Sequence, residues 1–284
     1  MHVLITGASG FVGSIVVERC PEDYSAVGLS RKRGAQKVCA DLSTLDHKDL
    51  VDLLHLNNVK AIIHLAAESN LSRCEQNPEA HLINVQATKL LTGVAKNLDI
   101  PIVFSSSDQV FSGGPHELSE TSTPSPKHEY GRQKLKGEQI ITGYSKGVVL
   151  RLPLVVGRHN QGLGSFETMY AQGKREGRLS LFFDEFRRPI HVYDAAMALW
   201  KAINWPSGIY HVAGPETLSR LELMNRLLST VGEYNIVIEA VSQSKFSFEY
   251  ARPQRLVLIS EKREVKNLQI RPIDHHKFNT QNTD

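Results

Sequence analysis

Two short segments near the middle of the chain carry side chains suited to proton transfer: FSSSDQVFSG at residues 104–113 and HEYGRQK at residues 128–134. Tyr130 and Lys134 are four positions apart, so on a helix they share one face. A phenol has an ordinary pKa of about 10, too high for efficient proton exchange at pH 7. We expect the lysine cation one turn away to lower that pKa. Ser107, at the end of an apolar run, could hold a substrate oxygen beside the phenol.

The elements that must position these residues alternate along the first half of the chain. Apolar runs predict strands at residues 2–6, 25–30, 37–42, 60–67, 101–107 and 147–156. Helical spacing appears between them, at residues 14–20, 46–57, 78–98 and 129–144. Strands this apolar, each separated by a helix, indicate a parallel sheet covered on both faces. The predicted fold class is therefore α/β, a doubly wound parallel sheet of the Rossmann type.

A glycine-rich turn, TGASGFVG, follows the first predicted strand and opens a helix. Positions without a Cβ let backbone N–H groups approach a pyrophosphate at a helix N-terminus. The strand–turn–helix context favours a dinucleotide-binding loop over a tight turn without a ligand. The predicted cofactor contacts in this loop are Gly7, Ser9, Gly10, Phe11, Val12 and Gly13.

The end of the second predicted strand indicates which dinucleotide binds. It reads Ser30, Arg31, Lys32, Arg33, where an acidic residue would bind ribose hydroxyls and repel a 2′-phosphate. Arginine can clamp a phosphate bidentately, and serine can donate a further hydrogen bond. We therefore expect NADP rather than NAD, through Ser30 and Arg31. The alternative is a solvated basic loop.

Two further segments are candidates for the cofactor site. Asp41 and Leu42 follow the next short strand, where a carboxylate could accept a hydrogen bond from adenine. Asp41 or Ser43 could equally cap the following helix. Small residues in HLAA, at residues 64–67, leave room for a cofactor to cross at Leu65, Ala66 and Ala67, although ordinary close packing would use them too.

The second half of the chain is less regular. Residues 158–186 are polar and glycine-bearing, residues 187–214 return to a strand–helix–strand pattern, and residues 217–232 form an amphipathic helix. We predict a nucleotide-binding domain of residues 1–157 to which residues 187–214 return. Residues 158–186 and 215–274 would form a smaller substrate-binding lobe, and residues 275–284 a disordered tail.

Composition excludes several classes of function. The 284 residues are 41% hydrophobic and 22% charged, with a formal net charge of +3. That balance is typical of a globular protein and a poor match to a nucleic-acid surface. The three cysteines lack metal or disulfide spacing, and the histidines are not spaced with other ligands, so no metal site is predicted. With no signal peptide or apolar membrane span, we expect a cytoplasmic protein without a membrane partner.

Several motifs together resemble the extended short-chain dehydrogenase/reductase family: TGASGFVG, HLAA, INVQAT, SSSDQVF, YGRQK and RRPIHVYDAA. The resemblance extends from residue 2 to residue 272. Within that family, SSDQVFSG, the YxxxK helix, GIYHVAG and ARP look most like the dTDP-4-dehydrorhamnose reductase-like proteins.

The resemblance implies a Ser–Tyr–Lys site that acts with NADPH. Ser107 and Tyr130 would contact the substrate carbonyl, and Lys134 would hold the nicotinamide ribose. Asn84, in INVQAT, would steady the site through a water, unless it bonds locally within its helix. Pro153 would pack near the nicotinamide.

Gln109 narrows the reaction that this site could catalyse. The sugar-nucleotide 4,6-dehydratases of the family carry adjacent acidic residues after the Ser/Thr, because elimination needs a general acid and a general base. Asp108 could fill one role, but Gln109 has no ionisable proton and cannot fill the other, which argues against a dehydratase. The rhamnose-forming reductases usually have a tyrosine at this position, so the substrate pocket differs. Substrate contacts are predicted from Ser107, Asp108, Gln109, Arg188 and Arg252, the two arginines for a diphosphate or, alternatively, in surface salt bridges.

These features predict an NADPH-dependent reductase of a keto group, acting on a small molecule and most simply a nucleotide-linked sugar. A sugar-nucleotide epimerase is one alternative, although such enzymes usually prefer NAD. A non-catalytic NADP-binding regulatory subunit, like that of methionine adenosyltransferase, is another. A homodimer is compatible with the sequence.

Overall fold

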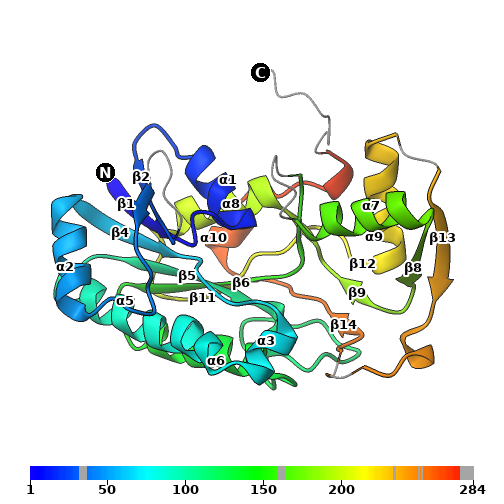
Figure 1. The fold of residues 1–284 in the computed structure, drawn as a ribbon, viewed down its shortest axis with the longest axis horizontal. Coiled ribbons are helices and arrows are strands. Elements are labelled where there is room, and N and C mark those ends of the chain that lie inside the picture. Colours follow the sequence, from blue (N-terminus) through cyan, green and yellow to red (C-terminus); the bar gives the residue numbers. More distant parts are fainter. Residues whose placement is uncertain (32–36, 159–163, 233–234, 249, 251, 276–284) are drawn as a thin grey trace.

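A seven-stranded parallel sheet forms the centre of the molecule (Figure 1). The computed structural model describes residues 1–31, 37–158, 164–232, 235–248, 250 and 252–275. The sheet order is β11-β6-β5-β4-β1-β2-β3. Its strands are β1 (His2–Thr6), β2 (Ser25–Ser30), β3 (Lys37–Cys39), β4 (Val59–His64), β5 (Ile102–Ser107), β6 (Gly147–Leu152) and β11 (Gly208–His211).

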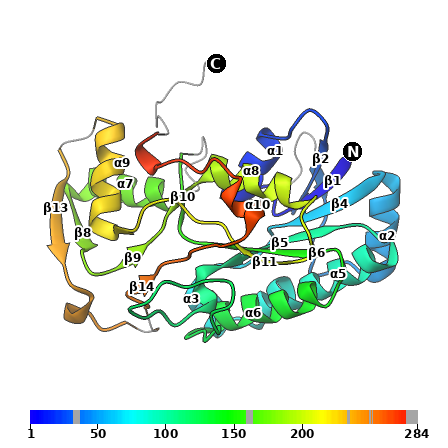
Figure 2. The same cartoon turned by 180° about the vertical axis from the view of Figure 1, so that it is seen from behind.

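Helices cover both faces of this sheet (Figures 1 and 2). Alternate residues of β1 show why: Val3 and Ile5 face one apolar core and Leu4 faces the other. The first core is closed by α1 (Phe11–Glu18) and α8 (Val192–Ala202), and the second by α2 (His47–Leu56), α5 (Ala87–Asn97) and α6 (Glu129–Thr142). The predicted doubly wound α/β fold is confirmed.

The strand order reverses between β1 and β4, because the chain leaves β1 toward β2 on one side and returns as β4 on the other. In open α/β sheets, ligands bind outside the carboxyl ends of the strands at such a reversal. The glycine-rich loop after β1 and the HLAA segment after β4 both lie at this point.

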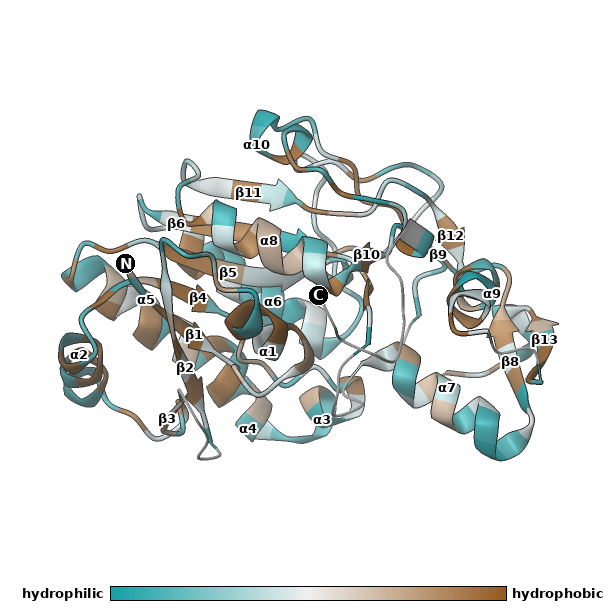
Figure 3. Ribbon diagram, turned by 90° about the horizontal axis from the view of Figure 1, so that it is seen from above, coloured by the Kyte–Doolittle hydropathy of each residue, from teal (hydrophilic) through white to brown (hydrophobic). Residues whose placement is uncertain are grey.

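A smaller lobe with its own apolar core lies beyond the carboxyl ends of the strands. It contains α7 (Ser165–Glu176), β8 (Arg178–Phe182), β9 (Phe186–Arg187), β12 (Leu218–Ser219), α9 (Arg220–Thr230), β13 (Val237–Val241) and β14 (Arg255–Leu256). Figure 3 shows the hydrophobic strands β1 and β4 inside the molecule and the hydrophilic α10 (Arg263–Lys266) outside. In the part of the chain that the structure describes, none of the helices has the length and apolar content that a bilayer crossing requires.

Three local features differ from the sequence-based expectations. The predicted helix at 78–98 is interrupted by a π-helical turn, Leu82–Gln86, between α4 (Pro78–His81) and α5. The predicted strand at 147–156 ends at Leu152, because Pro153 has no N–H for the ladder, and β7 (Val155–Val156) pairs instead with β10 (Ile190–His191).

The third difference concerns the start of α2. Neither Asp41 nor Ser43 caps this helix, since Asp46 does so by accepting from the backbone N–H of Asp49 at 2.8 Å. Asp41 instead closes its own turn and accepts from the N–H and the hydroxyl of Ser43. Leu42 is buried in the core beneath α2.

Candidate active site

The glycine-rich loop packs so closely that two of its positions exclude any side chain. Gly7 has φ +69°, and a Cβ there would lie 2.8 Å from the backbone nitrogen of Ala66. A Cβ on Gly13 would lie 2.1 Å from the carbonyl oxygen of Gly7. Gly10 is the N-cap residue of α1, so no capping side chain covers the start of this helix. The loop thus presents bare backbone at the strand reversal.

A buried chain of hydrogen bonds holds the HLAA segment against this loop. The Thr6 hydroxyl accepts from the backbone N–H groups of Leu65 and Ala66, both at 3.1 Å, and therefore donates to His64 Nδ1 at 2.7 Å. His64 Nε2 then donates to the Thr88 hydroxyl at 3.0 Å. Burial, assisted by the Lys134 cation, lowers the pKa of His64 to about 3. The imidazole is neutral and connects β1 to α5 through its hydrogen bonds to Thr6 and Thr88.

Asn84 lies in the π-helical turn and is buried, with 2% of its surface exposed. Its Oδ1 accepts from Glu68 N at 2.9 Å, and its Nδ2 donates to Glu68 O at 2.9 Å and to Gln133 Oε1 at 2.7 Å. π-Helical turns often occur at functional sites, where they redirect one side chain. Here the redirected amide ties the segment after β4 to α6, the helix that carries Tyr130 and Lys134.

The structure brings Ser107, Tyr130 and Lys134 together at the carboxyl end of β5. Lys134 is 4% exposed, and its Nζ lies 5.9 Å from the centre of the Tyr130 ring. The ammonium donates to the carbonyl oxygen of Ser105 at 2.8 Å. Burial lowers the pKa of Lys134 to about 8, although Glu138 opposes this shift.

The pKa of Tyr130 differs from the sequence-based expectation. Burial raises it well above its ordinary value, the Asp108 carboxylate raises it further, and a hydrogen bond with Ser107 only partly opposes them. The expected lowering by Lys134 does not appear, and the ammonium lies 5.9 Å from the ring centre and donates to the Ser105 carbonyl. In this protein the phenol therefore keeps its proton at neutral pH.

Ser107 is also the cap of a short 3₁₀ turn, Asp108–Val110. Its hydroxyl donates to Asp108 Oδ1 at 3.2 Å and accepts from the backbone N–H of Gln109 at 3.2 Å. Asp108 is 3% exposed, and its Oδ2 lies 3.4 Å from Arg187 Nε. Burial raises the pKa of this carboxyl, and Arg187 opposes the shift.

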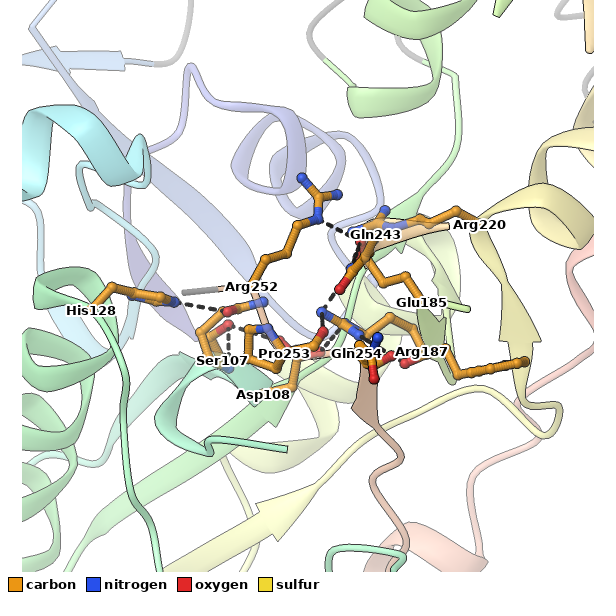
Figure 4. Close-up of polar contacts among 12 residues, drawn as sticks. Ser107, Asp108, His128, Glu185, Arg187, Arg220, Gln243, Arg252, Pro253 and Gln254 are labelled. Atoms are coloured by element: carbon orange, nitrogen blue, oxygen red, sulfur yellow. Dashed lines mark hydrogen bonds and ion pairs between the residues drawn. The ribbon is translucent and has the colours of Figure 1, made fainter. Parts of the chain in front are cut away.

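Beside these residues is a cavity of about 270 Å³ between α3 (Leu71–Gln76), the 3₁₀ turn and the smaller lobe. Figure 4 shows three arginines converging on the buried carboxylate of Glu185. The distances to Glu185 are 3.4 Å from Arg187 Nη2, 2.7 Å from Arg220 Nε and 2.5 Å from Arg252 Nε. Burial alone would raise the pKa of Glu185, but the guanidinium groups outweigh it and hold that pKa at about 2. The cavity is lined by Leu71, Gln109, Glu185, Arg187, Arg220, Phe248, Tyr250, Arg252 and Pro253.

The charge of this cavity favours an anion. Three guanidinium groups face two carboxylates, those of Glu185 and Asp108, which leaves one positive charge uncompensated. Arg220 and Arg252 are partly exposed, at 19% and 39% of their side chains, so they can reach a ligand. A phosphate or diphosphate group fits this arrangement.

Of the two arginines predicted to bind substrate, only Arg252 lines the cavity. The Arg188 guanidinium donates to the carbonyl oxygens of Pro215, at 2.8 Å, and Leu258, at 3.4 Å. Arg187 and Arg220 lie in the cavity and were missed. The two adjacent arginines at 187–188 indicated an anion site, but the neighbouring sequence does not show which of the two would line it.

The remaining predicted cofactor positions lie along the same edge of the sheet. Ser30 is 5% exposed at the end of β2, and Arg31 follows it on the surface. Lys32 and Arg33 lie outside the described residues. Pro153 is buried directly after β6. Leu65, Ala66 and Ala67 are half-buried beside the glycine-rich loop.

Three histidines from strand-like runs of the sequence are buried. His64, His191 and His211 are 0%, 4% and 1% exposed within the core. Among the residues that the structure describes, no group of three His, Cys, Asp or Glu side chains is placed to hold a metal ion.

Relatives of known sequence include a probable reductase and subunits of methionine adenosyltransferase. The probable low-salt glycan biosynthesis reductase Agl14 of Haloferax volcanii is 30% identical over 268 residues, covering 91% of this chain and 89% of the relative. The methionine adenosyltransferase 2 subunit beta of Xenopus laevis is 32% identical over 234 residues, covering 78% of this chain and 70% of the relative.

Solved structures share the whole fold. The dTDP-4-dehydrorhamnose reductase of Bacillus anthracis, in complex with NADP, superposes with a TM-score of 0.85 at 24% identity and covers 96% of each chain. A hypothetical dTDP-4-dehydrorhamnose reductase from Sulfolobus tokodaii has a TM-score of 0.80 at 28% identity, covering 95% of this chain and 96% of that one. The family model described as the RmlD substrate binding domain matches residues 1–279. Because that match spans nearly the whole chain, this protein belongs to the RmlD substrate binding domain family.

Proposed function

We propose that this protein is an NADPH-dependent reductase of a keto group on a nucleotide-linked sugar, with Tyr130 as the proton donor. The observation that carries the proposal is the grouping of Ser107, Tyr130 and Lys134 at the carboxyl end of β5, next to the cationic cavity that Gln109 lines. The family match and the reductase relative support the same class of reaction.

The residues present fit a dinucleotide. The bare backbone at Gly7, Gly10 and Gly13 suits a pyrophosphate, as such loops do in dinucleotide-binding sheets. Among the described residues, the Lys134 ammonium has one hydrogen-bond partner, Ser105 O, and so retains two N–H donors for the hydroxyls of a ribose. Ser30 and Arg31, after β2, would receive a 2′-phosphate. When bound, NADPH supplies the hydride.

The protein groups then manage the charge that develops on the substrate oxygen. Tyr130 carries its proton at neutral pH, because the ordinary pKa of a phenol is about 10 and burial raises it, so the phenol has a proton to donate. As negative charge grows on the carbonyl oxygen, the phenol becomes the stronger acid of the pair and transfers its proton. The hydrogen bond with Ser107 favours the phenolate that remains, and the Ser107 hydroxyl also orients the carbonyl.

The cavity supplies the binding energy for the rest of the substrate. A diphosphate placed against Arg220 and Arg252 would neutralise the excess positive charge, with Arg187 held behind them by Asp108 and Glu185. The sugar would then extend toward Gln109 and the phenol, since Gln109 lines the same cavity.

The test is oxidation of NADPH, followed at the nicotinamide absorbance, with a panel of nucleotide-linked 4-keto sugars. Turnover that falls at least about a hundredfold in Tyr130→Phe, with unchanged NADPH affinity, supports the proposal. Turnover that persists in Tyr130→Phe contradicts the role of this phenol. Product analysis separates the reductase from an epimerase, which would return its cofactor unchanged. Equal affinity for NADP and NAD would contradict the roles given to Ser30 and Arg31.

The similarity to methionine adenosyltransferase 2 subunit beta supports a second candidate, a regulatory subunit that binds NADP without turnover. Tight NADPH binding with no turnover on any 4-keto sugar would favour it. In that case Tyr130→Phe would leave the cellular role of the protein unchanged.

A further inference from the structure

His128 occupies an unusual place, two residues before the proposed proton donor and at the N-cap of α6. It is 1% exposed, and its ring stacks beside that of Tyr130, with 6.2 Å between centroids and 21° between planes. Its Nδ1 accepts a hydrogen bond from the backbone N–H of Gly131 at 3.1 Å. Because Nδ1 is an acceptor, it carries no proton.

The other ring nitrogen of His128 must then carry the proton, since a neutral imidazole has one donor and one acceptor. His128 Nε2 lies 2.9 Å from Gln109 Oε1, and it donates to that oxygen. Burial lowers the pKa of His128, in agreement with the neutral ring that this hydrogen-bond pattern requires. Figure 4 shows the His128 ring directed toward the end of β5, where Ser107 lies.

This hydrogen bond determines which way the Gln109 amide faces. With Oε1 accepting from His128, the NH₂ group is turned to the other side, and Gln109 lines the cationic cavity. Within the described ranges, this NH₂ group has no protein acceptor. It is a donor available to a ligand.

The backbone of Gln109 is held on both sides. Its N–H is held by Ser107 Oγ at 3.2 Å. Its carbonyl oxygen lies against Gly131, where a Cβ would come within 2.3 Å. Ser107 and Gly131 therefore fix the backbone of Gln109, and His128 fixes the orientation of its amide.

We propose that His128 is a positioning residue that holds the Gln109 amide NH₂ in the cavity as a hydrogen-bond donor to an oxygen of the substrate sugar. The inference rests on the proposed function and adds a determinant of specificity to the same site. A donor held in this way favours a sugar with a hydroxyl or ether oxygen at the contacted position. It disfavours the analogue without that oxygen, because the amide would then be buried without a partner.

The first arm of the test removes the hydrogen bond while keeping the helix cap. His128→Asn retains a cap, as Asn70 and Asn77 show at α3 and α4, but is too short to reach Gln109. We expect an unchanged NADPH affinity, little change in kcat, and a KM for the 4-keto sugar raised roughly tenfold. Gln109→Met, which keeps the length but has no donor, should raise KM by the same factor.

Coupling between the two residues separates positioning from a general structural effect. The double variant should raise KM no further than either single variant, because both act through one donor. Independent, multiplying effects on KM, or an unchanged KM in His128→Asn, would overturn the proposal.

The second arm needs no turnover. In ¹⁵N NMR of the full chain, His128 should be the Nε2–H tautomer, and the Gln109 NH₂ signals should shift when dTDP-glucose is added as a non-reducible nucleotide sugar. This shift should vanish in His128→Asn. An Nδ1–H tautomer, or Gln109 signals that ignore the nucleotide sugar, would overturn the inference. A third outcome is also possible: the Nε2–H tautomer and the Gln109 shift are both observed, but no 4-keto sugar is reduced. That outcome would contradict the proposed reductase function and leave the positioning role of His128 intact.

Discussion

Arg151 and Glu138 form a bidentate ion pair in the core behind the candidate active site. Nε lies 2.9 Å from Oε1 and Nη2 lies 2.6 Å from Oε2, and both side chains are 2% exposed. The Ser106 hydroxyl also donates to this carboxylate, at 2.5 Å. The pair connects β6 to α6, the helix that carries Tyr130.

Breaking this pair from one side is expected to be costly, because it leaves an uncompensated buried charge. Glu138→Gln should lower the free energy of unfolding by about 3–5 kcal/mol, measured by urea denaturation. As a control, Lys48→Gln removes an exposed ion pair with Asp52 and should leave that free energy unchanged. A Glu138→Gln variant as stable as the wild type would show that Arg151 finds another partner.

Two buried histidines predict acid sensitivity. Burial lowers the pKa of His64 to about 3 and, together with Arg151, that of His211 to about 4, against an ordinary value of about 6.5. Below pH 6.5 the unfolded chain binds protons at these positions and the folded chain does not, so the folded state loses stability as pH falls.

Each histidine should contribute a slope of about 1.4 kcal/mol per pH unit between pH 6 and pH 5, before carboxylates titrate. The measurement is the free energy of unfolding across that interval. His211→Gln should reduce the slope by about 1.4 kcal/mol per pH unit. If the free energy of unfolding did not change between pH 6.5 and pH 5, the pKa values of His64 and His211 in the folded protein would not be lowered.

Two glycines offer a matched comparison of steric effects. Gly13→Ala would place a Cβ 2.1 Å from Gly7 O, so the loop must move, and we expect NADPH affinity to fall at least about tenfold. Gly93, within α5, has no atom within 4 Å of its added Cβ, and Gly93→Ala should raise stability by about 1 kcal/mol without changing that affinity. Fluorescence titration with NADPH measures the affinity of both variants, and urea denaturation measures the stability of Gly93→Ala. Unchanged affinity in Gly13→Ala would separate this loop from the cofactor.

The arginines can be distinguished by the kinetic parameter that each affects. Arg220→Gln should raise KM for a nucleotide sugar about tenfold or more with a small change in kcat, because Arg220 lines the cavity and Tyr130 does not. Arg188→Gln should lower Tm instead of raising KM, since its guanidinium is bound to two backbone carbonyls. Steady-state kinetics and thermal denaturation of both variants test this assignment. The reverse pattern would place the diphosphate at Arg188.

Features that depend on short-range spacing could be predicted from the sequence. The alternating apolar runs specify the sheet because side chains on a strand alternate between faces, and both faces here are buried. The turn at Gly7 follows from a requirement for positive φ and close approach. Tyr130 and Lys134 share a face because one helical turn separates them. These relationships involve neighbours in the chain, so spacing alone reveals them.

Other features were decided only by the tertiary structure. Arg187 and Arg188 are adjacent and chemically identical, and the pairing of β9 with β12 and β14 determines which of them enters the cavity. The high pKa of Tyr130 depends on burial and on Asp108, which is 22 positions earlier in the sequence. The hydrogen bond from His128 to Gln109 joins residues 19 positions apart. Burial, electrostatics and long-range pairing arise when distant segments are brought together, and no local pattern of residues encodes them.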